Sequence, residues 1–315
     1  KDWVPRLGLP WSVFDHRHAE FWDQLSLLKA GLAYADIVTT VSPTYAREIL
    51  TPARGEGLDG FLRDDVARVV GITNGIDADA WDPRTDPDLP ARFTAADRRG
   101  KATCRAALAA ELGLAITDAT PIAAAIARLT PQKGIDLVAD VAPAAVAAGA
   151  RLIVLGAGDR ALEDRLRGLA AAHPGAIAVR LGFTPDLARR IYAGADLFVM
   201  PSRFEPCGLG QLYAMRYGTV PVVAAVGGLA DTVIDAVEPD GTGFRFEVID
   251  APGLWWALGR AIASFRDDRA GFLAIAGRAM ARDVSWRTAA RDYLGTFRAR
   301  RSRRASTIAG SAAST

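Results

Sequence analysis

Between residues 118 and 237, short apolar runs alternate with longer segments in which apolar residues recur every three or four positions. The short runs predict buried strands, and the longer segments predict amphipathic helices. The expected strands are 121–127, 151–158, 176–183, 196–200 and 219–225, and the expected helices are 134–150, 159–173, 185–195, 208–217 and 229–237. Strands and helices that alternate in this way form a parallel sheet covered on both faces, so the fold class is α/β, with a doubly wound, Rossmann-like domain.

The first 115 residues lack this regular alternation. A helix is expected over 24–35, a short buried strand over 36–43, a further strand that ends near 75, and a linker with one helix over 83–115. Ser42 is expected to cap the next helix, with Pro43 as its first residue. The expected domains are a partial α/β domain over 1–115, the Rossmann-like domain over 116–282, a closing helix over 283–300 and a disordered tail over 301–315.

Composition excludes several classes of protein. Half of the residues are hydrophobic, 23% are charged and the net charge is +2, so neither nucleic acid nor a membrane is an expected partner. No apolar run is long enough to span a membrane. The two cysteines, Cys104 and Cys207, fit a reducing cytoplasm and have no zinc-site spacing. His16 and His18 have no further Cys or His nearby, so no metal is expected.

Arg128 and Lys133 stand in a loop that follows the first strand of the regular region. Ligands of open parallel sheets bind at the carboxyl ends of the strands. Two cations at that edge suit a diphosphate, since arginine grips it as a fork and lysine acts as a point charge. They are equally well explained as two solvated surface cations.

Glycines follow two other strands. Gly156 and Gly158 would let the backbone approach a ligand, or they form a tight turn. Gly227 and Gly228 open a helix after the last of the five strands. This helix and the one that begins near Gly208 would converge on one ligand.

The segment PSRFEPCGLGQLYAM (201–215) places an acid, a cysteine and two glycines between a strand and a helix. Helix N-termini bind anions, so Leu209 and Gly210 would donate backbone N–H groups to phosphate. Glu205 would repel phosphate, and either accepts from a sugar hydroxyl or caps the helix. Phe183, after the third strand, either stacks on a base or belongs to the core.

These segments resemble bacterial glycogen synthases and plant starch synthases, which are retaining, ADP-glucose-dependent glucosyltransferases of the GT-B fold. The resemblance rests on PSRFEPCGLGQLYAMRYGTVPVV, GGLADTV, ARLTPQKGIDL, LLKAGLAYADIVTTVSPTYAREI, TNGIDADAWDP and DVSWRTAARDYLGTF. It implies that residues 1–115 are the end of the acceptor-side domain and that 116–282 bind the nucleotide sugar. It also implies glycogen biosynthesis, with ADP-glucose and an α-1,4-glucan as substrates, and no cofactor or metal.

The resemblance also implies roles for single residues. Arg128 and Lys133 would bind the donor diphosphate and stabilise the leaving ADP. Glu205 would hold the glucose hydroxyls, with backbone help from Cys207 and Gly208. The family usually has a tyrosine that stacks on adenine at Phe183, and a phenylalanine keeps the stacking face. Cys207 is then a compact structural thiol.

The chain departs from the family at several positions. Gly210 replaces a usual Thr, and Ala224-Ala225-Val226 replaces an Arg-Arg-Thr found in many relatives. The family's N-terminal Lys-x-Gly-Gly-Leu loop is not found. Two alternatives therefore stay open: a fragment that only binds a nucleotide sugar, and a GT-B transferase that uses another donor. Tyr213 disfavours the second alternative, because most other GT-B families have a second Glu at this position.

Overall fold

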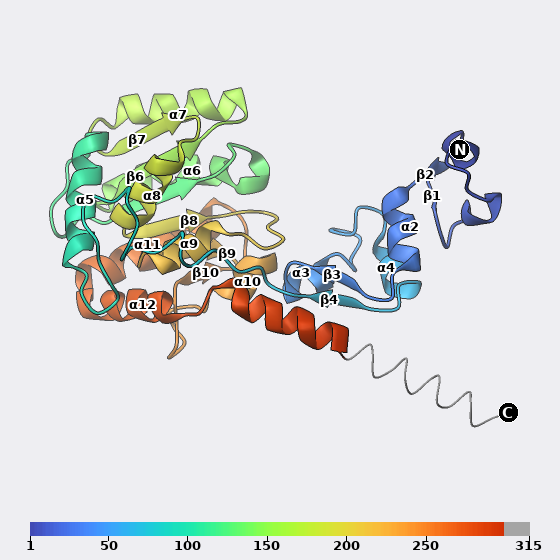
Figure 1. Ribbon diagram of the computed structural model, residues 1–315. Coiled ribbons are helices and arrows are strands. Elements are labelled where there is room, and N and C mark those ends of the chain that lie inside the picture. Colours follow the sequence, from blue (N-terminus) through green and yellow to red (C-terminus); the bar gives the residue numbers. More distant parts are fainter. Residues whose placement is uncertain (299–315) are drawn as a thin grey trace. The chain divides into compact units, whose positions relative to one another are not determined.

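The computed structural model describes residues 1–298, and the expected disordered tail lies outside the described residues. The chain divides into two compact units, one over Lys1–Thr73 and one that begins at Asn74, and each is described by itself (Figure 1). Residues 74–115 pack with the second unit, because α5 (Arg99–Leu112) lies against α8 (Pro185–Gly194). The domain limits expected from the sequence stay a prediction.

The first unit consists of short elements. They are α1 (Trp3–Arg6), η1 (Trp11–Val13), β1 (Glu20–Phe21), β2 (Gln24–Leu25), α2 (Leu27–Tyr34), β3 (Val38–Thr40), α3 (Pro43–Glu48), α4 (Asp59–Asp64) and β4 (Val69–Gly71). Strands β3 and β4 pair in parallel. The expected cap is confirmed, since the Ser42 hydroxyl accepts from the Tyr45 N–H and Pro43 opens α3. The strand expected over 36–43 is shorter and only partly buried.

The second unit is a doubly wound α/β domain. Its strands are β5 (Ile122–Ile126), β6 (Arg151–Gly156), β7 (Ile177–Leu181), β8 (Leu197–Met200), β9 (Val220–Ala224) and β10 (Phe244–Phe246). Its remaining helices are η2 (Pro131–Lys133), α6 (Ile135–Ala147), α7 (Arg160–Ala172), α9 (Gly210–Arg216), α10 (Gly227–Thr232), α11 (Ala251–Asp267) and α12 (Arg269–Ala281), and residues 286–298 are also helical. The parallel sheet has the order β10-β9-β8-β5-β6-β7. From β5 the strands are added first toward one edge of the sheet and then, from β8, toward the other edge, so the strand order reverses between β5 and β8.

Both faces of the sheet are buried, as the near-continuous apolar strands predict. Along β5, Ile122 and Ala124 pack into one cluster with α5 and α8, whereas Ala123 and Ala125 pack into another with α6 and α11. Figure 1 shows helices on both sides of the strands. No helix in the described residues is long and apolar enough to cross a membrane.

Two expectations for this unit were wrong. The helix expected over 229–237 begins earlier and ends at Thr232, after which Val233 is extended. Asp235 then accepts backbone N–H bonds from Val237 and Arg245, and this turn competes with helix continuation. The sixth strand, β10, was missed, because a strand of three residues is too short to show a clear periodicity.

Candidate functional site

Lys133 and Glu205 meet at the carboxyl ends of β5 and β8, the two strands between which the strand order reverses. Lys133 ends η2, and its Nζ lies 2.5 Å from Oε2 of Glu205. The same carboxylate oxygen accepts from the Ser202 hydroxyl at 3.1 Å. The side chains of Lys133 and Glu205 are 19% and 8% exposed. Two sequence-predicted residues are thus brought together as a mostly buried ion pair.

A cavity of about 150 Å³ opens beside this pair. Its wall comes from the ends of β5 and β8, the start of α9 and one residue of α8. The lining residues are Ile126, Ala127, Lys133, Ile135, Tyr192, Val199, Met200, Ser202, Glu205, Gly208, Leu209 and Gly210. Small-molecule sites commonly have about 300–1,000 Å³, so this cavity holds only part of a ligand as large as a nucleotide sugar.

Open hydrogen-bond donors face this cavity from the start of α9. Gly208 has a left-handed backbone (φ +71°). Within the described residues, the N–H groups of Gly208, Leu209 and Gly210 donate to no other protein group. Unsatisfied N–H groups at a helix start attract anions. The geometry therefore agrees with the donors expected from the sequence.

The start of α10 differs from the start of α9, because it contacts the backbone of residues 205–207. The Gly228 N–H donates to the carbonyl oxygens of Glu205 and Pro206 at 3.1 and 3.2 Å. A Cβ on Gly227 would lie 2.0 Å from the Glu205 carbonyl oxygen, and one on Gly228 2.1 Å from that of Cys207. Both glycines are thus needed for backbone packing, and a ligand contact by either stays a prediction.

The glycines after β6 are also explained by backbone packing. A Cβ on Gly156 would lie 1.9 Å from the Ala127 carbonyl oxygen, and one on Gly158 2.4 Å from that of Leu129. Leu129 and Gly158 form a parallel bridge that ties this loop to the Arg128 loop. The approach that the glycines permit is therefore between two loops, and a contact with a ligand stays a prediction.

Arg128 and Phe183 lie on the surface. The Arg128 guanidinium donates to Oε1 of Gln132 at 3.3 Å, and Nε2 of Gln132 donates to the Phe204 carbonyl at 3.2 Å. Gln132 thereby links the two loops that carry Arg128 and Glu205. Phe183 is 64% exposed, so the core interpretation of this residue is excluded. Its ring is available for stacking.

Tyr213 packs against the segment that precedes the Rossmann-like domain. Its ring stacks on Trp81 with centroids 3.9 Å apart, and the Arg189 guanidinium lies 4.2 Å from the Trp81 centroid. Tyr213 is not among the residues that line the cavity. Tyr213 therefore acts as a packing residue in this structure.

Cys207 is buried, and burial raises the pKa of its thiol. A protonated thiol is a poor nucleophile, which agrees with a structural role. Within residues 1–298, no cluster of three His, Cys, Asp or Glu side chains could hold a metal.

Sequence reasoning missed the polar residues that position the loop. Nε2 of Gln211 is fully buried and donates to the carbonyls of Cys207 and Gly208 and to the Thr232 hydroxyl. Ser202 orients the carboxylate of Glu205. Both residues lie in the segment 201–215 between β8 and α9, but their spacing in the sequence does not show which atoms they contact.

The chain is similar to known proteins in sequence and in fold. Residues 1–64 match the family described as the starch synthase catalytic domain, and residues 120–264 match the glycosyl transferases group 1 family. The chain is 54% identical over 299 residues to a glycogen synthase of Anaeromyxobacter dehalogenans and 48% identical over 295 residues to one of Leptothrix cholodnii. These matches cover 95% and 92% of the chain, but only 62% and 60% of the relatives.

A solved structure is similar over both units. It is the catalytic domain of starch synthase IV from Arabidopsis thaliana bound to ADP and acarbose, with a TM-score of 0.85 and 33% identity. The match covers 90% of this chain and 60% of that one. The fold is that of GT-B glycosyltransferases, and the chain is similar to glycogen and starch synthases. It spans about three fifths of the length of these relatives.

Proposed function

We propose that this chain is part of an ADP-glucose-dependent glycogen synthase. The whole enzyme would transfer glucose from ADP-glucose to the non-reducing end of an α-1,4-glucan, with retention at the anomeric carbon. The observation that carries the proposal is the meeting of Lys133 and Glu205 beside the open N–H groups of α9. The similarity to a starch synthase structure bound to ADP and acarbose supports the choice of donor and acceptor.

Arg128 and Lys133 would bind the diphosphate of the donor. Arg128 is exposed at the mouth of the site, and Lys133 is held at the cavity wall. As the bond from the sugar to the diphosphate breaks, negative charge grows on the leaving ADP, and positioned cations stabilise that charge. The N–H groups of Leu209 and Gly210 would act on the same phosphates.

Glu205 would accept hydrogen bonds from the glucose hydroxyls, with the backbone of Cys207 and Gly208 completing the sugar pocket. Its carboxylate is already oriented by Ser202 and Lys133. A group held before the sugar arrives loses little entropy on binding. Because the cavity of about 150 Å³ is small, the nucleoside would lie outside it, where Phe183 would stack on adenine.

The buried, unpaired cysteines are compatible with the reducing cytoplasm in which we expect this enzyme to act. The acceptor would bind on the far side of the donor sugar.

Calorimetric titration of this chain with ADP-glucose, and with UDP-glucose for comparison, tests the donor. We expect selective, saturable binding of ADP-glucose. Preference for UDP-glucose would overturn the choice of donor. Transfer of labelled glucose to glycogen by the chain alone then separates an active transferase from a binding module that has no turnover.

A further inference from the structure

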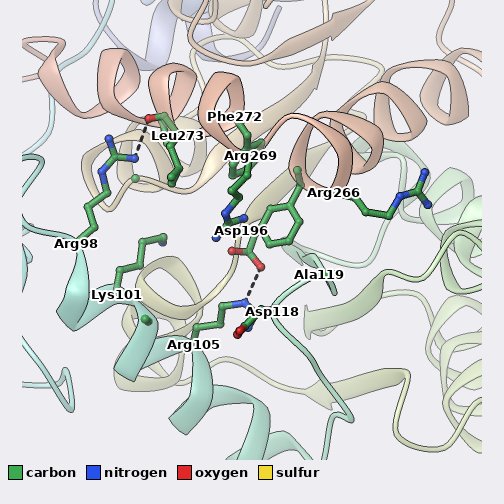
Figure 2. Close-up of a pocket in the computed structure, with 14 residues that line it drawn as sticks. Arg98, Lys101, Arg105, Asp118, Ala119, Asp196, Arg266, Arg269, Phe272 and Leu273 are labelled. Atoms are coloured by element: carbon green, nitrogen blue, oxygen red, sulfur yellow. Dashed lines mark hydrogen bonds and ion pairs between the residues drawn. The ribbon is translucent and has the colours of Figure 1, made fainter.

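A second cavity lies at the opposite end of the sheet from Lys133 and Glu205. It has a volume of about 510 Å³, and it is enclosed by α5 on one side and by α11 and α12 on the other (Figure 2). Its base includes Asp196, which directly precedes strand β8, and Gly218, which lies two residues before strand β9. A strand of five residues spans roughly 17 Å, so the two cavities are separate.

The wall of this cavity carries an excess of positive charge. Its charged lining residues are Arg98, Lys101, Arg105, Arg266 and Arg269, against Asp118 and Asp196. Two of the cations have carboxylate partners. Arg105 pairs with Asp196 at 3.0 Å, and Arg266 pairs with Asp267 at 2.7 Å and points away from the others in Figure 2.

The other three cations have no carboxylate within ion-pair distance among residues 1–298. Arg98 donates through Nη1 to the Leu273 carbonyl at 2.8 Å and through Nε to the Ala95 carbonyl at 3.2 Å. Lys101 uses all three N–H bonds on the carbonyls of Ala193 and Tyr217 and the hydroxyl of Thr219. Lys101 therefore adds positive potential without a free donor, whereas Arg98 keeps donors that these bonds do not use.

Arg269 is held without a hydrogen bond to any described residue. Its Cζ lies over the buried ring of Phe265, 3.9 Å from the ring centroid. In Figure 2 the side chain extends from α12 toward Asp196 and the α5 side of the cavity. The cation–π contact helps to hold the guanidinium in place, and its N–H groups are not used by another described residue.

The charges in this cavity are incompletely compensated. Partial burial lowers the pKa of both Arg98 and Arg269, and the pKa of Arg98 is lowered further by its proximity to Arg269. Two guanidinium groups that repel each other in a partly dry site gain from a shared anion. The donor chemistry proposed above does not use these cations.

We propose that this cavity is a binding site for a small phosphate-bearing anion, gripped by Arg98 and Arg269. Guanidinium groups bind phosphate oxygens in pairs, and the volume lies within the range of small-molecule sites. The apolar wall of Phe272, Leu273 and Ala276 would contact the carbon part of a phosphomonoester. Because the site faces the amino ends of the strands, its ligand does not compete with the sugar donor.

Inorganic phosphate is the probe that tests the site. The melting temperature of the chain is measured against phosphate concentration at constant ionic strength in chloride, with and without saturating ADP. We expect a saturable rise in melting temperature that persists when ADP is present. Arg269→Gln and Arg98→Gln should each weaken the apparent affinity at least about tenfold. Arg266→Gln, on the same face but pointing away, is the matched control and should bind phosphate like the parent chain.

A response no larger than that to chloride, loss of the response on adding ADP, or unchanged affinity in Arg269→Gln would overturn the proposal. Arg269 makes no hydrogen bond in the fold, so its replacement leaves no buried group unpaired. If the chain proves unable to bind ADP, a saturable response that depends on Arg269 still supports this site. The failure of the donor proposal and of this one are therefore distinguishable.

Discussion

Nζ of Lys133 lies 2.5 Å from Oε2 of Glu205, although 72 positions separate the two residues in the chain. Each charge compensates the other in a place that water barely reaches. The contact places the acid that we propose for the sugar hydroxyls next to the cation that we propose for the phosphates. The ion pair should therefore contribute to the stability of the fold as well as to the proposed chemistry.

Replacing Lys133 alone should destabilise the chain. In Lys133→Ala the carboxylate of Glu205 stays buried without its cation, and we expect a loss of about 2–4 kcal/mol in the free energy of unfolding. The double variant Lys133→Met with Glu205→Gln should recover most of this loss. Urea denaturation measures both, with the exposed Arg128→Ala as the control. An effect of Lys133→Ala as small as that of Arg128→Ala would contradict the buried pair.

Gly210 packs directly against the ring of Phe198, so substitutions at these two positions should have non-additive effects on stability. A Cβ on Gly210 would lie 2.9 Å from Cε1 of Phe198, which is fully buried. A threonine at this position should therefore cost about 1–3 kcal/mol in this chain. Phe198→Leu makes room, so the two changes together should cost less than the sum of their separate costs, as a double-mutant cycle measures.

Gly168→Ala is the matched control for that experiment, because a Cβ there meets nothing within 4 Å on helix α7. Alanine should stabilise the chain at this site by about 0.5–1 kcal/mol. If Gly210→Thr were equally harmless, the contact with Phe198 could not be the reason for glycine at 210.

The stack of Tyr213 on Trp81 should contribute to stability and not to donor binding. We expect Tyr213→Ala to lower the free energy of unfolding by about 2–4 kcal/mol, since it removes a ring from an aromatic cluster. Tyr213→Phe keeps the stack and should stay within about 0.5 kcal/mol of the parent chain. Calorimetry of ADP-glucose binding at a temperature where Tyr213→Ala is folded should give an unchanged affinity, and a large loss there would place Tyr213 in the site.

Lys101 should make stability depend on pH above 8. Burial lowers the pKa of Lys101 from 10.5 to about 8. Below pH 8 the amine is charged in both states, so its burial cost is constant. Between pH 8 and 10.5 the unfolded chain holds the proton and the folded chain does not. This term therefore stabilises the fold as pH rises, by at most about 1.4 kcal/mol per pH unit.

The contribution of Lys101 is isolated by comparison with Lys101→Met. The thiols of Cys104 and Cys207 act in the opposite direction, because burial raises the pKa of both. We expect the difference in unfolding free energy between the parent chain and Lys101→Met to shift in favour of the parent from pH 8 to 10. Urea denaturation at each pH measures it, and a constant difference would show that Lys101 keeps its charge.

The sequence by itself determined the alternation of strands and helices from β5 to β9 and the strand-end loops that hold Arg128, Lys133 and Glu205. Both follow from local properties: the length and apolar character of each run, and the glycines and prolines that interrupt them. The resemblance to glycogen and starch synthases was also readable from the sequence, because the motifs are long and contiguous.

Only the tertiary structure decided which glycines pack against the backbone of neighbouring loops. Gly156, Gly227 and Gly228 look like ligand-binding glycines in the sequence, but neighbouring loops fill the space beside them. It also decided that Phe183 is exposed and that Arg98 and Arg269 line one cavity. These facts depend on contacts between segments far apart in the chain, and no local pattern of residues encodes such distances.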